Sequence, residues 1–125
     1  MKKFAALLAV LVCVAVSVTT VHAAEDDFNK FKVKRIVSKN KCFKCHAITR
    51  EKVGPAYINV SQKFNDDPDG RQKIYTHLTT SPEIEVEGRK ETHVNLEADG
   101  DEEINEVINW LLSLAHNRRY ARYLR

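Results

Sequence analysis

The clearest alternation of apolar and polar positions lies near the C-terminus of the chain. Apolar residues recur there at spacings of three and four, at Ile104, Val107, Ile108, Leu111, Leu112 and Ala115. This spacing predicts an amphipathic helix, and Trp110 and Leu114 would widen its apolar stripe. The acidic residues 101–103 suit the first turn of such a helix, and Asp99 or Asp101 is expected to cap it.

Helical spacing of apolar residues predicts three earlier helices, over about residues 26–39, 57–64 and 70–79. A Gly-Pro turn at 54–55 precedes the second of these helices, and the polar stretch 65–70 ends it. The pattern therefore predicts an all-α fold of three to five helices. The first and last helices are expected to lie in contact.

Residues 81–100 show no helical period and contain Pro82, Gly88 and Gly100. Only Ile84 and Val86 hint at the alternation of a strand. We therefore predict a long loop, and such loops in compact domains are usually functional or disordered.

The first residues have the three parts of a secretory signal peptide. Lys2 and Lys3 precede an apolar run of about 15 residues, and a small-residue site follows at 21–23. An uncleaved membrane anchor is the alternative, but the run is shorter than the roughly 20 residues that a membrane-spanning helix needs. We predict a signal at 1–23, one domain at 24–116 and a basic extension at 117–125, in an exported, periplasmic protein with no stable membrane span after cleavage.

Removal of this signal would take Met1 and Cys13 with it. The sequence has no other methionine, and its remaining cysteines are Cys42 and Cys45.

Charge is unevenly distributed along the rest of the chain. Residues 30–52 are strongly basic, whereas acids outnumber bases in 63–106. Solvated helix faces would explain these runs; the functional alternative is a basic surface around the cysteines that attracts an acidic partner.

Cys42, Cys45 and His46 form a C-x-x-C-H sequence. A dithiol redox site would need a βαβ setting, which this chain lacks. A structural zinc site would need two further ligands at short spacing, and only isolated histidines remain: His77, His93 and His116. Attachment of a c-type haem fits best, because two cysteines three residues apart can reach neighbouring ring substituents while the next histidine reaches the iron.

Three segments resemble the short bacterial class I cytochromes c in the same order and with similar spacing. They are NKCFKCHAI at 40–48, VGPAY at 53–57 and DEEINEVINWLLS at 101–113. The resemblance covers roughly residues 28–115. It implies the class I cytochrome c fold, with helices wrapped around one covalently attached haem c.

The same resemblance implies roles for individual residues. Cys42 and Cys45 would form the thioethers, and His46 would be the proximal iron ligand. The carbonyl of Pro55 would accept a hydrogen bond from the other ring nitrogen of His46, which fixes the tautomer and makes the ligand more electron-donating. Tyr57 matches an aromatic residue near the haem, as Trp110 does, although core packing would explain both.

The distal ligand is where this chain departs from the family. Those cytochromes use a methionine in the loop before the last helix, and here KETHVNL aligns with that segment. We therefore predict His93 as the distal ligand. His77 is the alternative on the predicted third helix, and His116 suits the C-terminal end of the last helix. A five-coordinate or weakly ligated iron also remains open.

Ligation by His46 and His93 would lower the potential relative to a methionine-ligated haem and close the iron to small molecules. We therefore expect a single-electron carrier rather than an enzyme. The alternatives are a gas-binding or sensing haem protein that takes up NO or CO, and a small haem subunit of a larger cytochrome complex. Arg89 and Lys90 are candidates to pair with the haem propionates.

The expected partners are redox proteins. The chain could also form a homo-oligomer, or a hetero-oligomer with another cytochrome. The extension at 117–125 combines arginines with aromatic residues, a composition that suits nucleic acid or a membrane surface. Export argues against nucleic acid. We therefore interpret this segment as a helix extension or a docking segment for a partner subunit.

Overall fold

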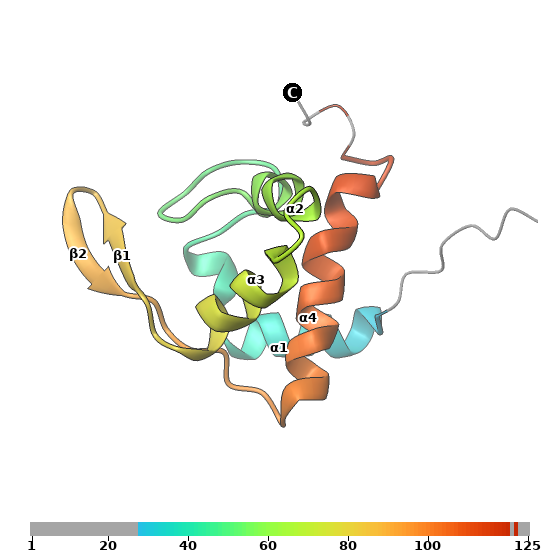
Figure 1. Cartoon of the computed structure of the whole chain (residues 1–125), viewed down its shortest axis with the longest axis horizontal. Coiled ribbons are helices and arrows are strands. Elements are labelled where there is room, and N and C mark those ends of the chain that lie inside the picture. The colour runs from blue at the N-terminus through green and yellow to red at the C-terminus, as the bar shows by residue number, and fades with distance from the viewer. Residues whose placement is uncertain (1–27, 121, 123–125) are drawn as a thin grey trace, which may run out of the picture.

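The structure is a computed structural model that describes residues 28–120 and 122 (Figure 1). The predicted export signal and most of the last five residues lie outside this range. The elements follow in the order α1 (Lys30–Lys39), η1 (Cys42–Lys44), α2 (Tyr57–Asn65), α3 (Gly70–Thr79), β1 (Glu83–Val86), β2 (Arg89–Thr92), α4 (Asp101–Ser113) and η2 (Leu114–His116). Within the described range, no helix is long and apolar enough to span a membrane.

Helices α1 and α4 pack against each other, as the apolar pattern predicts, and α2 and α3 complete the core (Figure 1). Ile108 of α4 is fully buried, and Ile36 of α1 is only 1% exposed. The buried cluster also takes in Tyr57 from α2 and Ile74 from α3. The predicted all-α fold with its terminal helices in contact is confirmed.

Helix α1 begins later than its apolar pattern predicts, because Asn29 caps it. The Asn29 Oδ1 accepts hydrogen bonds from the backbone N–H groups of Phe31 and Lys32, at 3.1 and 3.0 Å. Asparagine is among the preferred N-cap residues because its side chain satisfies N–H groups that lack a helical partner. The helix therefore begins at Lys30.

The prediction of a structureless loop over residues 81–100 is wrong for its first half. β1 and β2 pair as an antiparallel hairpin, which projects from the helices beside α3 (Figure 1). Glu87 and Gly88 form its turn with φ values of 50° and 76°, and positive φ at both positions is typical of the tight hairpin turn of type I′. Val86 is the one buried residue of the two strands, and β2 is exposed along its whole length.

The predicted side-chain cap of α4 is also wrong. Gly100, with φ of 93°, occupies the N-cap position and provides no side-chain hydrogen bond. Instead the third residue of the helix, Glu103, reaches back and accepts the Asp99 N–H at 3.0 Å. The acidic first turn that the sequence predicts is present, with Asp101, Glu102 and Glu103.

Candidate metal centre

The cysteines and the following histidine lie in one tight turn directly after α1. Lys41 adopts a left-handed conformation with φ of 54°, which turns the chain out of the helix and into η1. The carbonyl of Cys42 then accepts the N–H groups of both Cys45 and His46, at 3.2 and 3.0 Å. This turn presents both thiols and the imidazole from a single short segment.

Neither cysteine of this turn is in a disulfide. Cys42 is half-buried, whereas Cys45 is exposed. Burial raises the pKa of the Cys42 thiol above its usual value. Both thiols are thus free for covalent attachment to another group.

The His46 ring is fixed by three neighbours. Its Nδ1 lies 2.8 Å from the carbonyl oxygen of Pro55, which is the contact that the sequence resemblance predicts. The ring stacks on Tyr57 with centroids 4.7 Å apart and an interplanar angle of 16°. Gly54 passes so close that a Cβ at this position would lie 2.4 Å from the His46 Cε1. The hydrogen bond engages Nδ1, which leaves Nε2 as the nitrogen for a metal.

Gly54 is a functional residue that the sequence analysis missed. The Gly-Pro pair is visible in the sequence, but it signals only a turn. The requirement for glycine arises from the approach of the His46 ring, which lies eight residues earlier in the chain.

His93 lies on the segment that follows β2. The ring centroids of His46 and His93 are 6.3 Å apart, and those of His77 and His93 are 4.4 Å apart. The structure therefore brings together both histidines that the sequence offers as a distal ligand. The Nδ1 of His93 is buried without a hydrogen-bond partner.

Burial is the main cause that lowers the pKa of His77 and His93, and repulsion from neighbouring histidines adds to it. Both shifts favour the neutral imidazole. Neutral imidazole is the form that binds metal ions.

The described part of the chain contains no group of three or more His, Cys, Asp or Glu side chains arranged to hold a metal ion. A zinc ion would need four such ligands, so the arrangement does not support the zinc hypothesis. A haem iron needs only axial ligands from the chain, because the porphyrin provides the other four nitrogens. The His46 and His93 imidazoles, with centroids 6.3 Å apart, and the two free thiols in the same turn as His46 fit that requirement.

Other predicted residues lie away from this turn. Arg89 is on the exposed hairpin, where its guanidinium lies 3.7 Å from the Glu87 carboxylate and 3.8 Å from that of Glu91. Lys90 pairs with Glu83 at 2.8 Å. Contacts of Arg89 and Lys90 with haem propionates stay predictions.

The remaining aromatic and histidine predictions fall near the core. Trp110 meets Tyr57 edge to face with centroids 5.4 Å apart. The His116 Nε2, at the end of η2, lies 3.2 Å from the Asn65 Oδ1, at the end of α2. Tyr120, from the predicted extension, packs against the core cluster.

A helical domain whose first and last helices pack together, with a C-x-x-C-H turn directly after the first helix, has the fold of a c-type cytochrome. Comparison with known families agrees: residues 32–115 match the family model described as cytochrome c. The chain belongs to the cytochrome c family, whose members bind one covalent haem c and transfer electrons to redox partner proteins.

Two solved structures are similar to this chain. The class 1 cytochrome MtoD from Sideroxydans lithotrophicus ES-1 is 31% identical, with a TM-score of 0.66, over 70% of this chain and 98% of that one. Wild-type cytochrome c552 from Nitrosomonas europaea shares the fold at 20% identity and a TM-score of 0.51, over 65% of this chain and 98% of that one. A search of curated proteins found no match.

Proposed function

We propose that this protein is an exported, periplasmic carrier of single electrons whose haem iron is ligated by His46 and His93. Cys42 and Cys45 would hold the haem through thioethers. The haem supplies an iron that alternates between two oxidation states. His46 and His93 would bind that iron through their imidazoles, and the Pro55 carbonyl would orient His46.

The observation that carries this proposal is the distance of 6.3 Å between the His46 and His93 ring centroids. Two imidazoles bound at about 2.0 Å to opposite sides of one metal ion have centroids roughly 6 Å apart. Met1 is the only methionine of the sequence and lies in the predicted signal, so a histidine is the strong ligand at hand. The buried Nδ1 of His93 has no hydrogen-bond partner, which fits a ring that is positioned to bind a metal rather than to form a hydrogen bond within the protein.

The ligand pair has a consequence for the potential. Methionine as the distal ligand raises the potential of a c-type haem, and imidazole donates more strongly to oxidised iron. The proposed carrier therefore works at low potential. The basic segment 30–52 around the attachment turn would face an acidic region of its redox partner.

The test is electron paramagnetic resonance of the ferric holoprotein, with variants at both candidate histidines. We expect a low-spin bis-imidazole signal in the wild type and in His77→Ala, and its loss in His93→Ala. His77→Ala is the matched control, because its ring lies beside that of His93. His93→Met should raise the potential measured by redox titration.

A high-spin ferric signal in wild type and His93→Ala alike would overturn the proposal in favour of an open, gas-binding iron. Loss of the low-spin signal in His77→Ala, but not in His93→Ala, would assign the distal position to His77. Gel filtration with native partners separates a free carrier from a subunit of a larger complex.

A further inference from the structure

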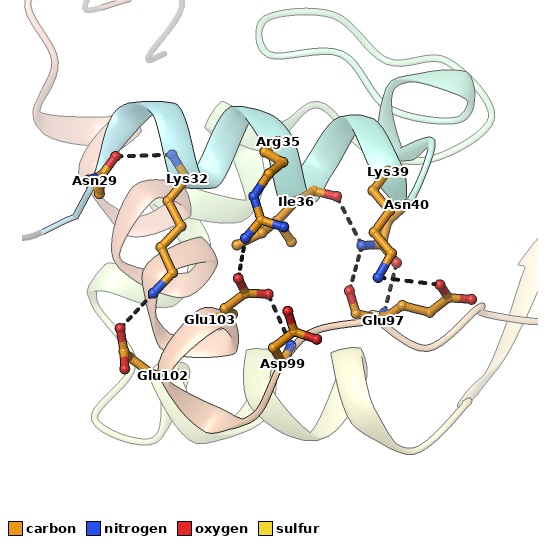
Figure 2. A network of polar contacts seen from close by, with 10 residues as sticks. All are labelled: Asn29, Lys32, Arg35, Ile36, Lys39, Asn40, Glu97, Asp99, Glu102 and Glu103. Atoms are coloured by element: carbon orange, nitrogen blue, oxygen red, sulfur yellow. Dashed lines mark hydrogen bonds and ion pairs between the residues drawn. The ribbon is translucent and has the colours of Figure 1, made fainter.

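Asn40 connects the haem-attachment turn with the segment that carries His93. It is the C-cap residue of α1 and lies two residues before Cys42. Its Oδ1 accepts the Glu97 N–H at 2.7 Å, and its Nδ2 donates to the Glu97 carbonyl at 3.0 Å (Figure 2). The same Nδ2 donates to the Ile36 carbonyl at 2.9 Å. One amide side chain thus satisfies both backbone groups of Glu97 while it stays bonded to α1.

The segment 93–97 is held on its other side by α3 and the residues after it. The His93 N–H donates to the Pro82 carbonyl at 2.9 Å, and the Leu96 N–H donates to the Leu78 carbonyl at 2.8 Å. Leu96 also packs against the core cluster. The amide of Asn40 holds the same segment from the α1 side.

The contact requires an amide at position 40. Only a side chain with a donor and an acceptor at the same distance can pair with the N–H and the C=O of one residue. An aspartate would keep the acceptor but would place a carboxylate against the carbonyl oxygens of Glu97 and Ile36. The ion pair between Lys39 and Glu97, at 3.9 Å and largely exposed, is a weak substitute.

We propose that Asn40 is the positioning residue that keeps His93 on the iron. It does so by tying the segment 93–97 to the same helix that leads into Cys42 and His46. This inference rests on the proposed ligation by His46 and His93. Asn40 acts on His93 through this segment and does not itself contact the haem.

The test is the rate at which cyanide binds to the ferric holoprotein, followed by stopped-flow absorption. Cyanide binds only after the distal ligand leaves, so the rate reports how firmly His93 is held. Loss of the Asn40 contacts in Asn40→Ala should raise this rate about tenfold. Asn40→Asp, a variant of nearly the same shape, keeps one of the three hydrogen bonds but sets a carboxylate against two carbonyl oxygens, so it should raise the rate as well.

Two control variants separate positioning from general loosening. Asn29→Ala removes the cap at the other end of α1, so it should lower the unfolding midpoint without changing the cyanide rate. Glu97→Ala removes the side chain that meets Lys39 but keeps the backbone groups that Asn40 binds, so its rate should equal that of the wild type.

Wild-type cyanide rates in both Asn40 variants would overturn the inference while the ligation stands. An increase in Asn29→Ala as large as that in Asn40→Ala would also overturn it, because loss of helix stability alone would then explain the effect. Failure of the proposed ligation shows separately, as the absence of a bis-imidazole signal in the wild type.

Discussion

Replacement of Gly54 by alanine tests how firmly the His46 ring is held. The new Cβ would lie 2.4 Å from the His46 Cε1 and 2.8 Å from its Nδ1. Carbon atoms in contact are normally separated by about 3.5–4.0 Å, so the ring or the loop must move by roughly 1 Å. The Nδ1 lies 2.8 Å from the Pro55 carbonyl, and a shift of that size breaks this hydrogen bond.

Three effects decide the size of the loss in the free energy of unfolding. Overpacking costs about 1–3 kcal/mol, and loss of the hydrogen bond costs about 1 kcal/mol. Alanine restricts the unfolded chain more than glycine, which returns about 0.4–1 kcal/mol. The steric effect wins, and we expect Gly54→Ala to be less stable by about 1–3.5 kcal/mol.

The assay is guanidinium unfolding of the holoprotein followed by far-ultraviolet circular dichroism, together with a redox titration. Without the hydrogen bond to Pro55, His46 donates less strongly to the iron, so the potential should rise. Gly88→Ala is the matched control. Its φ of 76° strains an alanine, but no atom lies within 4 Å of the new Cβ.

Gly88→Ala should therefore lose some stability without any change in potential. The proposed role of Gly54 is wrong if Gly54→Ala unfolds at the same denaturant concentration as Gly88→Ala and keeps the wild-type potential. A change in potential without a loss of stability would contradict the steric argument in particular, because the clash must be relieved in the folded state.

Two further predictions concern the helix contacts that support the site. Ser61 is fully buried, and its Oγ accepts the Ala115 N–H at 2.9 Å. Ser61→Ala should therefore lower the free energy of unfolding, measured in urea, by about 1–3 kcal/mol. The control Ser113→Ala should lower it by less, because the Ser113 hydroxyl bonds only within its own helix. The Asp99 N–H, and then Arg35, lower the pKa of Glu103 from its usual 4.5. The stabilisation by Glu103 is therefore present above about pH 4.5 and is lost as the pH falls through the lowered folded-state pKa. The urea midpoint should fall less between pH 7 and pH 3 in Glu103→Gln than in the wild type, and an equal fall in both would contradict the assignment.

The helices and the attachment turn were predictable because their signals are local. The period of apolar residues marks α4, and the spacing of Cys42, Cys45 and His46 is set within one turn of chain. The hairpin was not predictable in the same way, because β2 is exposed along its whole length and carries no apolar alternation. Its one local signal is Gly88 after Glu87, which an irregular loop would also tolerate.

Contacts between distant parts of the chain left no trace in the sequence. The start of α4 illustrates this, because two aspartates there predict a side-chain cap. In the structure it is Glu103 that accepts the Asp99 N–H, and the same carboxylate pairs with Arg35 of α1. The pairing of Asn40 with Glu97 depends on the packing of α1 against the segment before α4. Such partners are chosen by tertiary structure, so only the folded arrangement reveals them.

Helix α1 links the two sides of the proposed haem site. Its last residues lead into the turn of Cys42 and His46, while one face of the helix binds the chain between His93 and α4 (Figure 2). Along that face Asn40 holds Glu97, Arg35 pairs with Glu103, and Lys32 meets Glu102 at 2.6 Å. A rotation of α1 about its own axis would break all three contacts at once. Changes along this face of α1 should therefore reach the segment that carries His93, whereas changes at the tip of the hairpin should leave the His46 side intact.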